Sequence, residues 1–141
     1  MGNKQSLPLC HFEELQQKIS ESSNSFFLIN TLETNEQTCL IYGTLTPDEE
    51  IDKINECLKY KTKKSIIIYG KNYHDPKIHT KYSQLSQYGL FNIKLYIGGL
   101  FEWLLLQDIY GKELFSTTSE QLDLLKFRSR SFFSTNLLLN E

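Results

Sequence analysis

The sequence predicts a single α/β domain with a mostly parallel central sheet flanked by helices. Segments with helical and strand patterns alternate along the chain, as they do when helices cover a parallel sheet. The length of 141 residues leaves room for one domain with its own core. The content of 40% hydrophobic and 13% aromatic residues is typical of a globular chain.

A helix and a buried strand are the first expected elements. Phe12, Leu15 and Ile19 repeat at helical spacing within residues 11–22. Residues 26–30 then form an apolar run of strand length.

A second helix is predicted to begin after Thr46, because Thr46-Pro47-Asp48-Glu49 combines a capping box with proline in the first helical position. We expect its apolar face to contain Ile51, Ile54 and Leu58, with Cys57 beside them as a core residue. Four lysines follow, and a basic run at a helix end is usually solvated. These are Lys59, Lys61, Lys63 and Lys64.

The central strand is expected at residues 65–69 and a later strand at 92–97. Asp75 and Pro76 suit the N-cap and first position of a helix that would end at Gly89. Gly98 and Gly99 would let the later strand turn into an apolar helix over 100–107. We expect that helix to contribute core side chains, namely Phe101, Trp103, Leu104 and Leu105.

Three segments are expected along the chain. Residues 1–10 form an N-terminal tail, 11–118 form the domain, and 119–141 form a C-terminal helix and tail. Residues 118–121 could cap that helix, which would dock through Leu122, Leu124, Leu125 and Phe127. The apolar residues beyond 129 suit either packing against the domain or binding a partner.

The N-terminus fits the N-myristoylation pattern. Gly2 becomes the acceptor amine once Met1 is removed, and Ser6 fills the small polar position. An acylated N-terminus and an ordinary tail both stay open. One myristoyl chain gives only marginal attachment, so stable anchoring needs a second determinant. The candidates are Cys10 as a palmitoyl site and a basic cluster of Lys126, Arg128 and Arg130.

Composition limits the location and the partners. No apolar run reaches the roughly 20 residues that span a bilayer, and no secretory signal is present, so we expect a cytoplasmic protein. The net charge of −2 gives no overall attraction to nucleic acid, and none is expected as a partner. Cys10, Cys39 and Cys57 lack paired spacing, which favours reduced structural thiols over a disulfide framework or a zinc site.

Two motifs resemble a rhodanese domain. In that family the central strand ends in Tyr-Cys, and a later strand ends in Gly-Gly-x-x-x-Trp. Tyr69 stands where expected, Gly70 takes the place of the catalytic cysteine, and residues 98–103 supply the second motif. The phrase at 98–111 resembles rhodanese-like proteins of giant viruses and protists, and the resemblance covers about residues 12–118.

The resemblance also implies that the polar framework of the active site is incomplete. The family's first strand ends in Ile-Asp-x-Arg, which corresponds to residues 29–32, Ile-Asn-Thr-Leu. Asp75 stands five residues after Gly70, where an arginine is usual. A sulfurtransferase or a phosphatase on this fold needs a thiolate at a helix N-terminus, and glycine supplies none.

The candidate site is therefore a degenerate active-site loop of Gly70, Lys71, Asn72, Tyr73, His74 and Asp75. We favour a self-capped loop, in which the Asp75 carboxylate takes the helix amides that an enzyme offers to its substrate anion. Alternatively, Lys71, Asn72 and Tyr73 offer a cation, an amide and a ring to a peptide or a phosphate. His74, Asp75 and His79 lack a fourth ligand, so no metal site is expected.

We therefore expect a non-catalytic rhodanese-like binding or scaffold module, membrane-tethered if Gly2 is acylated. The alternative is a divergent sulfurtransferase with a displaced thiol, for which Cys57 is the candidate. A phosphatase of this fold would need the same missing cysteine and arginine. No cofactor is expected, the sequence does not identify a protein partner, and membrane contact would occur through Gly2.

Overall fold

A computed structural model describes residues 7–21 and 26–130. The candidate acyl acceptor Gly2 and the apolar tail 131–141 lie outside these residues.

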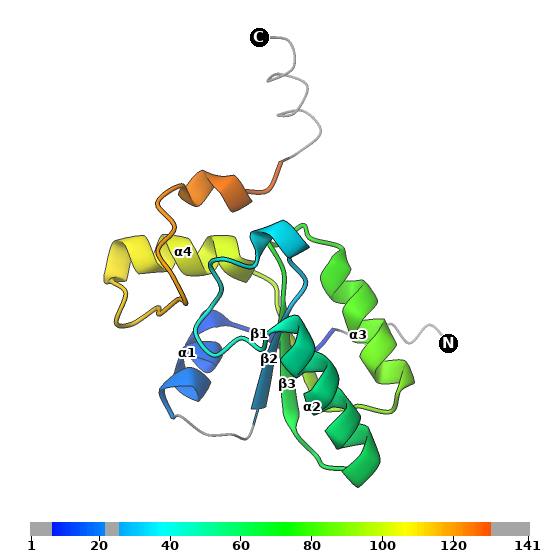
Figure 1. Ribbon diagram of the computed structural model, residues 1–141. Coiled ribbons are helices and arrows are strands. Elements are labelled where there is room, and N and C mark those ends of the chain that lie inside the picture. The colour runs from blue at the N-terminus through cyan, green and yellow to red at the C-terminus, as the bar shows by residue number, and fades with distance from the viewer. Residues whose placement is uncertain (1–6, 22–25, 131–141) are drawn as a thin grey trace.

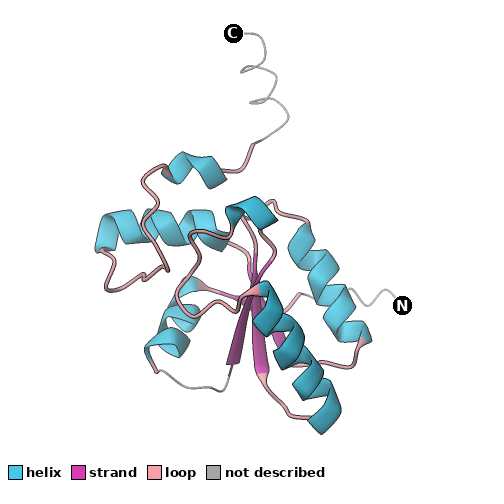
Figure 2. Cartoon of the chain, in the orientation of Figure 1, coloured by secondary structure: helices cyan, strands magenta, loops and turns pink. Residues whose placement is uncertain are grey.

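A four-stranded parallel sheet forms the centre of the molecule (Figures 1 and 2). Its strands lie in the order β1-β4-β3-β2, and every neighbouring pair is parallel. The predicted fold class is confirmed, as are the strands expected near 26–30, 65–69 and 92–97. The strands are β1 (Leu9–Cys10), β2 (Phe26–Asn30), β3 (Ser65–Tyr69) and β4 (Ile93–Tyr96).

Helices cover both faces of the sheet (Figure 1). On one face Ile67 and Tyr69 of β3 pack with residues of α1 (Phe12–Ser20) and α4 (Gly99–Tyr110). On the other face Ile66 and Ile68 pack with residues of α2 (Pro47–Tyr60) and α3 (Lys77–Gln87). Burial on both faces explains why β3 reads as a continuous apolar run.

The capping box of α2 is confirmed, but its apolar face is partly wrong. The Thr46 hydroxyl accepts from the Glu49 amide at 3.2 Å, and the Glu49 carboxylate accepts from the Thr46 amide at 2.9 Å. Ile54 and Cys57 are buried, whereas Ile51 is 59% exposed and Leu58 is also exposed. The buried stripe runs through Ile54 and Cys57, one helical turn apart, and the two outer residues lie at its margins.

The apolar α4 is longer than predicted and continues to Tyr110. Trp103 and Leu104 are buried and Phe101 is partly buried, but Leu105 is exposed.

The sheet begins at Leu9, before the domain start expected at residue 11. Leu9 and Cys10 pair with Leu95 and Tyr96 as β1. Two residues cannot show a strand period, so the sequence gives no signal for this strand.

The helix predicted to begin after residues 118–121 is wrong for the part that the structure describes, because residues 119–130 contain a 3-10 turn, η2 (Leu124–Phe127), and no α-helix. Thr118, expected to cap that helix, instead donates its amide to Leu40 O at 2.8 Å, and its hydroxyl accepts from the Leu40 amide. Of the apolar residues expected to dock, Phe127 is buried, whereas Leu122 is 83% exposed.

Candidate functional site

The candidate loop connects β3 to α3 at the carboxyl end of the sheet. Ligands of open parallel sheets bind at this end, because the strands end there together and the loops that follow them are adjacent. Three segments border the loop: the residues after β2, the start of α4, and the segment around η2.

Gly70 leaves room for the Asp75 side chain. A Cβ placed on Gly70 would lie 2.4 Å from Asp75 Oδ2 and 2.9 Å from its Cγ. The φ angle of Gly70 is not in the positive range, so the backbone itself would accept another residue. Glycine is needed here because the Asp75 carboxylate fills the space that a side chain at position 70 would take.

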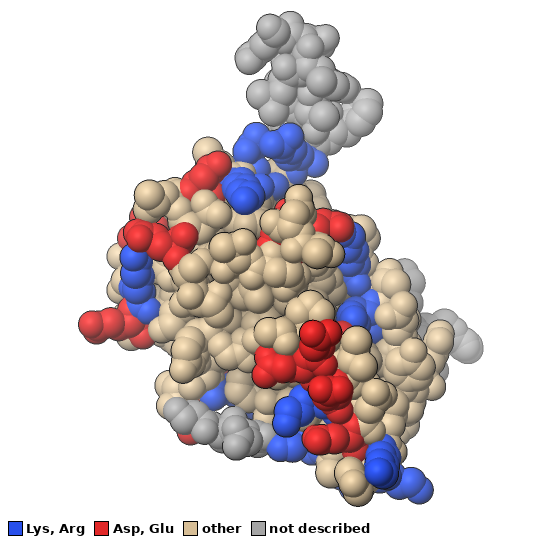
Figure 3. Space-filling view, in the orientation of Figure 1, with Lys and Arg blue, Asp and Glu red and all other residues tan. Residues whose placement is uncertain are grey.

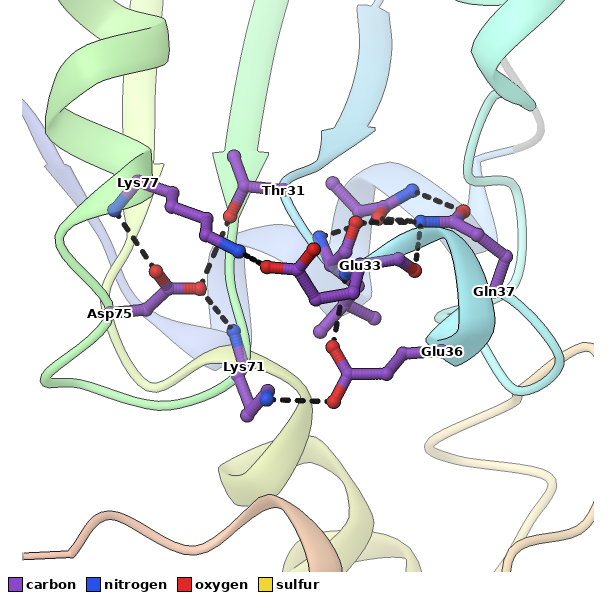
Figure 4. Close-up of polar contacts among 9 residues, drawn as sticks. Thr31, Glu33, Glu36, Gln37, Lys71, Asp75 and Lys77 are labelled. Atoms are coloured by element: carbon purple, nitrogen blue, oxygen red, sulfur yellow. Dashed lines mark hydrogen bonds and ion pairs between the residues drawn. The ribbon is translucent and has the colours of Figure 1, made fainter.

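The Asp75 carboxylate is held by three donors (Figure 4). Oδ2 accepts from the Lys71 amide at 3.0 Å and from the Thr31 hydroxyl at 3.3 Å, and Oδ1 accepts from the Lys77 amide at 3.0 Å. The carboxylate thus takes one amide of α3, that of Lys77, and one amide of the loop, that of Lys71. The prediction of Asp75 as the N-cap is wrong, because α3 begins at Lys77 and Pro76 is its N-cap. A negative group inside the loop therefore already uses backbone amides that could otherwise bind an anion.

Two carboxylates that sequence reasoning missed pair with the cations of the loop. Glu33 and Glu36 lie at η1 (Thr34–Glu36), directly after β2, and close their own capping box. Lys71 Nζ lies 2.7 Å from the Glu36 carboxylate, and Lys77 pairs with Glu33 (Figure 4). The loop therefore presents no excess of positive charge to an incoming anion.

The side-chain amides of Asn30 and Gln37 form a hydrogen-bonded network at the end of β2, where the resemblance implies an aspartate. Asn30 is buried, and its side-chain oxygen accepts from the Leu32 amide at 2.9 Å and from Gln37 Nε2 at 2.8 Å. Gln37 also accepts from Asn30 Nδ2 at 3.1 Å. These bonds fix the chain as it leaves β2 without placing a charge there.

The chain around η2 packs over the other side of the loop. Asn72 is buried, donates from Nδ2 to Phe127 O at 2.9 Å, and accepts from the His74 amide at 2.9 Å. His74 Nδ1 bonds with the Ser129 hydroxyl. Lys71, Asn72 and Tyr73 were considered as ligand contacts. Of these three side chains, only Tyr73 is exposed and has no polar side-chain partner among the described residues, and its ring lies beside that of His74.

Gly99 brings the start of α4 against the loop. Its φ is +69°, and a Cβ there would lie 2.7 Å from Gly70 O and 2.9 Å from the Asn72 amide nitrogen. The Leu100 and Phe101 amides donate to the carbonyls of Gly70 and Lys71 at 2.9 and 3.0 Å. The first free amides of α4 are thus used to hold the loop backbone.

The three thiols lie in the core rather than at the loop. Cys10, Cys39 and Cys57 are 3%, 2% and 3% exposed. Burial, reinforced by the negative charge of Glu14, raises the pKa of Cys10 to about 11. Cys57 packs in the cluster that also holds Ile54 and Leu85, so very little of its surface is open to solvent.

Among residues 7–21 and 26–130, no three His, Cys, Asp or Glu side chains come together in a way that could hold a metal ion. His79 is exposed on α3, and the only partner described for the His74 ring nitrogens is the Ser129 hydroxyl.

Comparison with known proteins identifies the fold. No family model and no curated protein sequence matches the chain. The rhodanese-like domain of the Alr3790 protein from Anabaena sp. superposes with a TM-score of 0.54 and 16% identity, over 89% of this chain and 86% of that one. The BH2092 protein from Bacillus halodurans gives 0.56 and 19%, over 92% and 89%.

An As-Sb reductase from Leishmania major superposes with a TM-score of 0.57 and 11% identity, over 96% of this chain and all of that one. The fold of this chain is therefore rhodanese-like. At these identities the likeness concerns the fold and not the activity. The relation to proteins of giant viruses and protists stays a prediction.

Proposed function

We propose that this chain is a non-catalytic rhodanese-like module that works by binding a protein partner and is tethered to a membrane through acylated Gly2. The observation that carries the non-catalytic part is the position of Asp75. Its carboxylate fills the space beside Gly70 and accepts the amides of Lys71 and Lys77. A loop in this state has no thiol, and its Lys71 and Lys77 amides are not free to bind a substrate anion.

The burial of the thiols supports this proposal over a divergent sulfurtransferase. Sulfur transfer through a persulfide needs a thiolate that the donor can reach. Cys57, the candidate for that role, is 3% exposed within the core. The same argument bears on the As-Sb reductase neighbour, because a thiol-based reduction would also need an accessible thiolate.

Sulfur transfer from thiosulfate to cyanide tests the non-catalytic role. We expect no turnover above the uncatalysed rate and no persulfide in the intact mass after incubation with thiosulfate. Cys57→Ser is expected to behave as the parent in both measurements. Turnover that is lost in Cys57→Ser would instead establish the divergent sulfurtransferase. Arsenate reduction, assayed in parallel, is also expected to be absent.

The tether is proposed because Gly2 fits the acylation pattern. No helix within the described residues has the length and apolar character to cross a bilayer. Cys10 is an unsuitable second acylation site, since it lies buried in β1. Of the two candidates for a second determinant, the basic cluster of Lys126, Arg128 and Arg130 is the one that stays open.

Gly2→Ala is expected to abolish acylation and to shift the protein from the membrane fraction to the supernatant in a eukaryotic cell. Intact mass reports the acyl group, and fractionation reports the location. Ser6→Thr is the matched control, because the acylation pattern accepts either serine or threonine at this position, and it should stay acylated. A parent protein without an acyl group would remove the tether from the proposal.

A further inference from the structure

A surface of different chemistry lies at the end of the sheet opposite the candidate loop. Two turns form it, one joining α2 to β3 and the other joining α3 to β4, at the amino ends of the two inner strands. We call it the lysine–aromatic surface and define it by six exposed residues: Lys59, Tyr60, Lys61, Lys63, Tyr88 and Phe91.

Positive charge on this surface is not balanced locally. The turn from α2 to β3 contributes Lys59, Lys61 and Lys63 to the surface and no acid, and residues 88–92 carry no charge. Within the described part of the chain Lys59, Lys61 and Lys63 form no ion pair, in contrast to the paired lysines of the candidate loop. Figure 3 shows basic side chains at the lower tip, where α2 ends in Figure 1, and acidic ones higher on the same helix.

Exposed rings accompany these lysines. Phe91 is 90% exposed, and Tyr60 and Tyr88 are exposed as well. A hollow of about 680 Å³ lies between the two turns and is lined by Lys61, Lys63, Tyr88 and Phe91, with no acidic residue on its walls. A single exposed ring is ordinary in a folded protein. Rings set among unpaired lysines match the interface of an anionic bilayer, where the rings enter the headgroup layer and the lysines meet negative lipids.

We propose that the lysine–aromatic surface docks the domain onto an anionic lipid bilayer. Charge complementarity favours this partner, because the surface is cationic on a chain whose net charge is −2. The parallel pairing of β1 with β4 also places Leu7 and Pro8, which precede β1, toward the end of the sheet where β4 begins.

This inference goes beyond the proposed function, since it uses only described residues and holds whether or not Gly2 is acylated. It also supplies the second determinant that a single myristoyl chain requires.

Vesicle co-sedimentation of the full chain, made without an N-myristoyltransferase, tests the inference. We expect binding to phosphatidylcholine vesicles that contain phosphatidylserine, weaker binding as salt is raised, and none to pure phosphatidylcholine. The double variant Lys59→Glu/Lys63→Glu is expected to lower the partition coefficient at least roughly 30-fold. Phe91→Ser is expected to lower it about tenfold.

Matched controls carry the same changes outside the surface. Lys53→Glu/Lys112→Glu alters the net charge equally, and Leu122→Ser removes an apolar side chain that is 83% exposed. Both are expected to bind nearly as well as the parent. All of these positions are exposed, so the variants should keep the parent's unfolding midpoint.

Three results would overturn the inference. The first is no binding to vesicles that contain phosphatidylserine, and the second is equal loss in the two charge-reversed double variants. The third is loss with the lysine variants but none with Phe91→Ser, which would show that the exposed rings do not enter the headgroup layer. Because the protein is unacylated, none of these results bears on Gly2.

Discussion

Gly99→Ala is expected to lower the free energy of unfolding by about 3–5 kcal/mol. This is the largest loss of stability that we predict for a glycine-to-alanine substitution in this chain. Two costs combine at this position. The φ of +69° disfavours any residue with a Cβ, and the new methyl would meet Gly70 O at 2.7 Å and the Asn72 amide nitrogen at 2.9 Å. Both contacts are backbone atoms, so no side chain can rotate to relieve them.

Gly43→Ala separates these two costs. Gly43 also has a positive φ, +91°, but a Cβ there would meet nothing within 4 Å. We expect it to lose only about 1–2 kcal/mol, from backbone strain alone. Urea unfolding of both variants gives the comparison. Equal losses of unfolding free energy in the two variants would mean that the new methyl group at position 99 has no steric cost against the loop backbone.

The elements predicted correctly depend on short-range chemistry. The apolar run of β3, the capping box at Thr46 and the Asp75 carboxylate before α3 each involve residues within a few positions of one another. Local hydrogen bonding and burial on both sheet faces determine such features, so the sequence is sufficient to find them. The rhodanese-like fold could be predicted for the same reason, because the motifs that indicate it are short segments at the ends of two strands.

The features that were missed depend on residues far apart in the sequence. Thr118 pairs with Leu40 instead of capping a helix, across nearly 80 positions. Glu36 pairs with Lys71 only because β2 and β3 are neighbours in the sheet. A single sequence does not show which charges or hydroxyls the fold brings together. Each of these side chains would also be stable in contact with water, so its presence does not indicate a partner.

Gly70 shows how a correct observation can be given an incomplete cause. From the sequence, glycine at this position meant only the absence of a nucleophile. In the structure the position is coupled to Asp75, because the carboxylate lies where a side chain at 70 would begin. Gly70 and Asp75, which the sequence presents as two separate observations, are therefore structurally linked.

This coupling predicts strong non-additivity between Gly70→Ala and Asp75→Ala. We expect Gly70→Ala alone to cost about 2–3 kcal/mol, since the methyl displaces a carboxylate held by two backbone amides. Asp75→Ala alone should cost about 2–3 kcal/mol, because those amides lose their acceptor. In the double variant the methyl finds the space empty, so its cost should be at least about 1.5 kcal/mol less than the sum of the two.

Asp75→Asn is the matched control, because it removes the charge and keeps the side-chain volume. In the Asp75→Asn background, Gly70→Ala should lower the free energy of unfolding nearly as much as it does in the parent. Urea unfolding of the two double-mutant cycles, one with Asp75→Ala and one with Asp75→Asn, gives both coupling energies. Additivity within about 0.5 kcal/mol for Gly70→Ala with Asp75→Ala would show that the carboxylate does not compete for this space. If the coupling is found, a thiol at position 70 needs Asp75 replaced first. Gly70→Cys alone would then not rebuild an active-site loop.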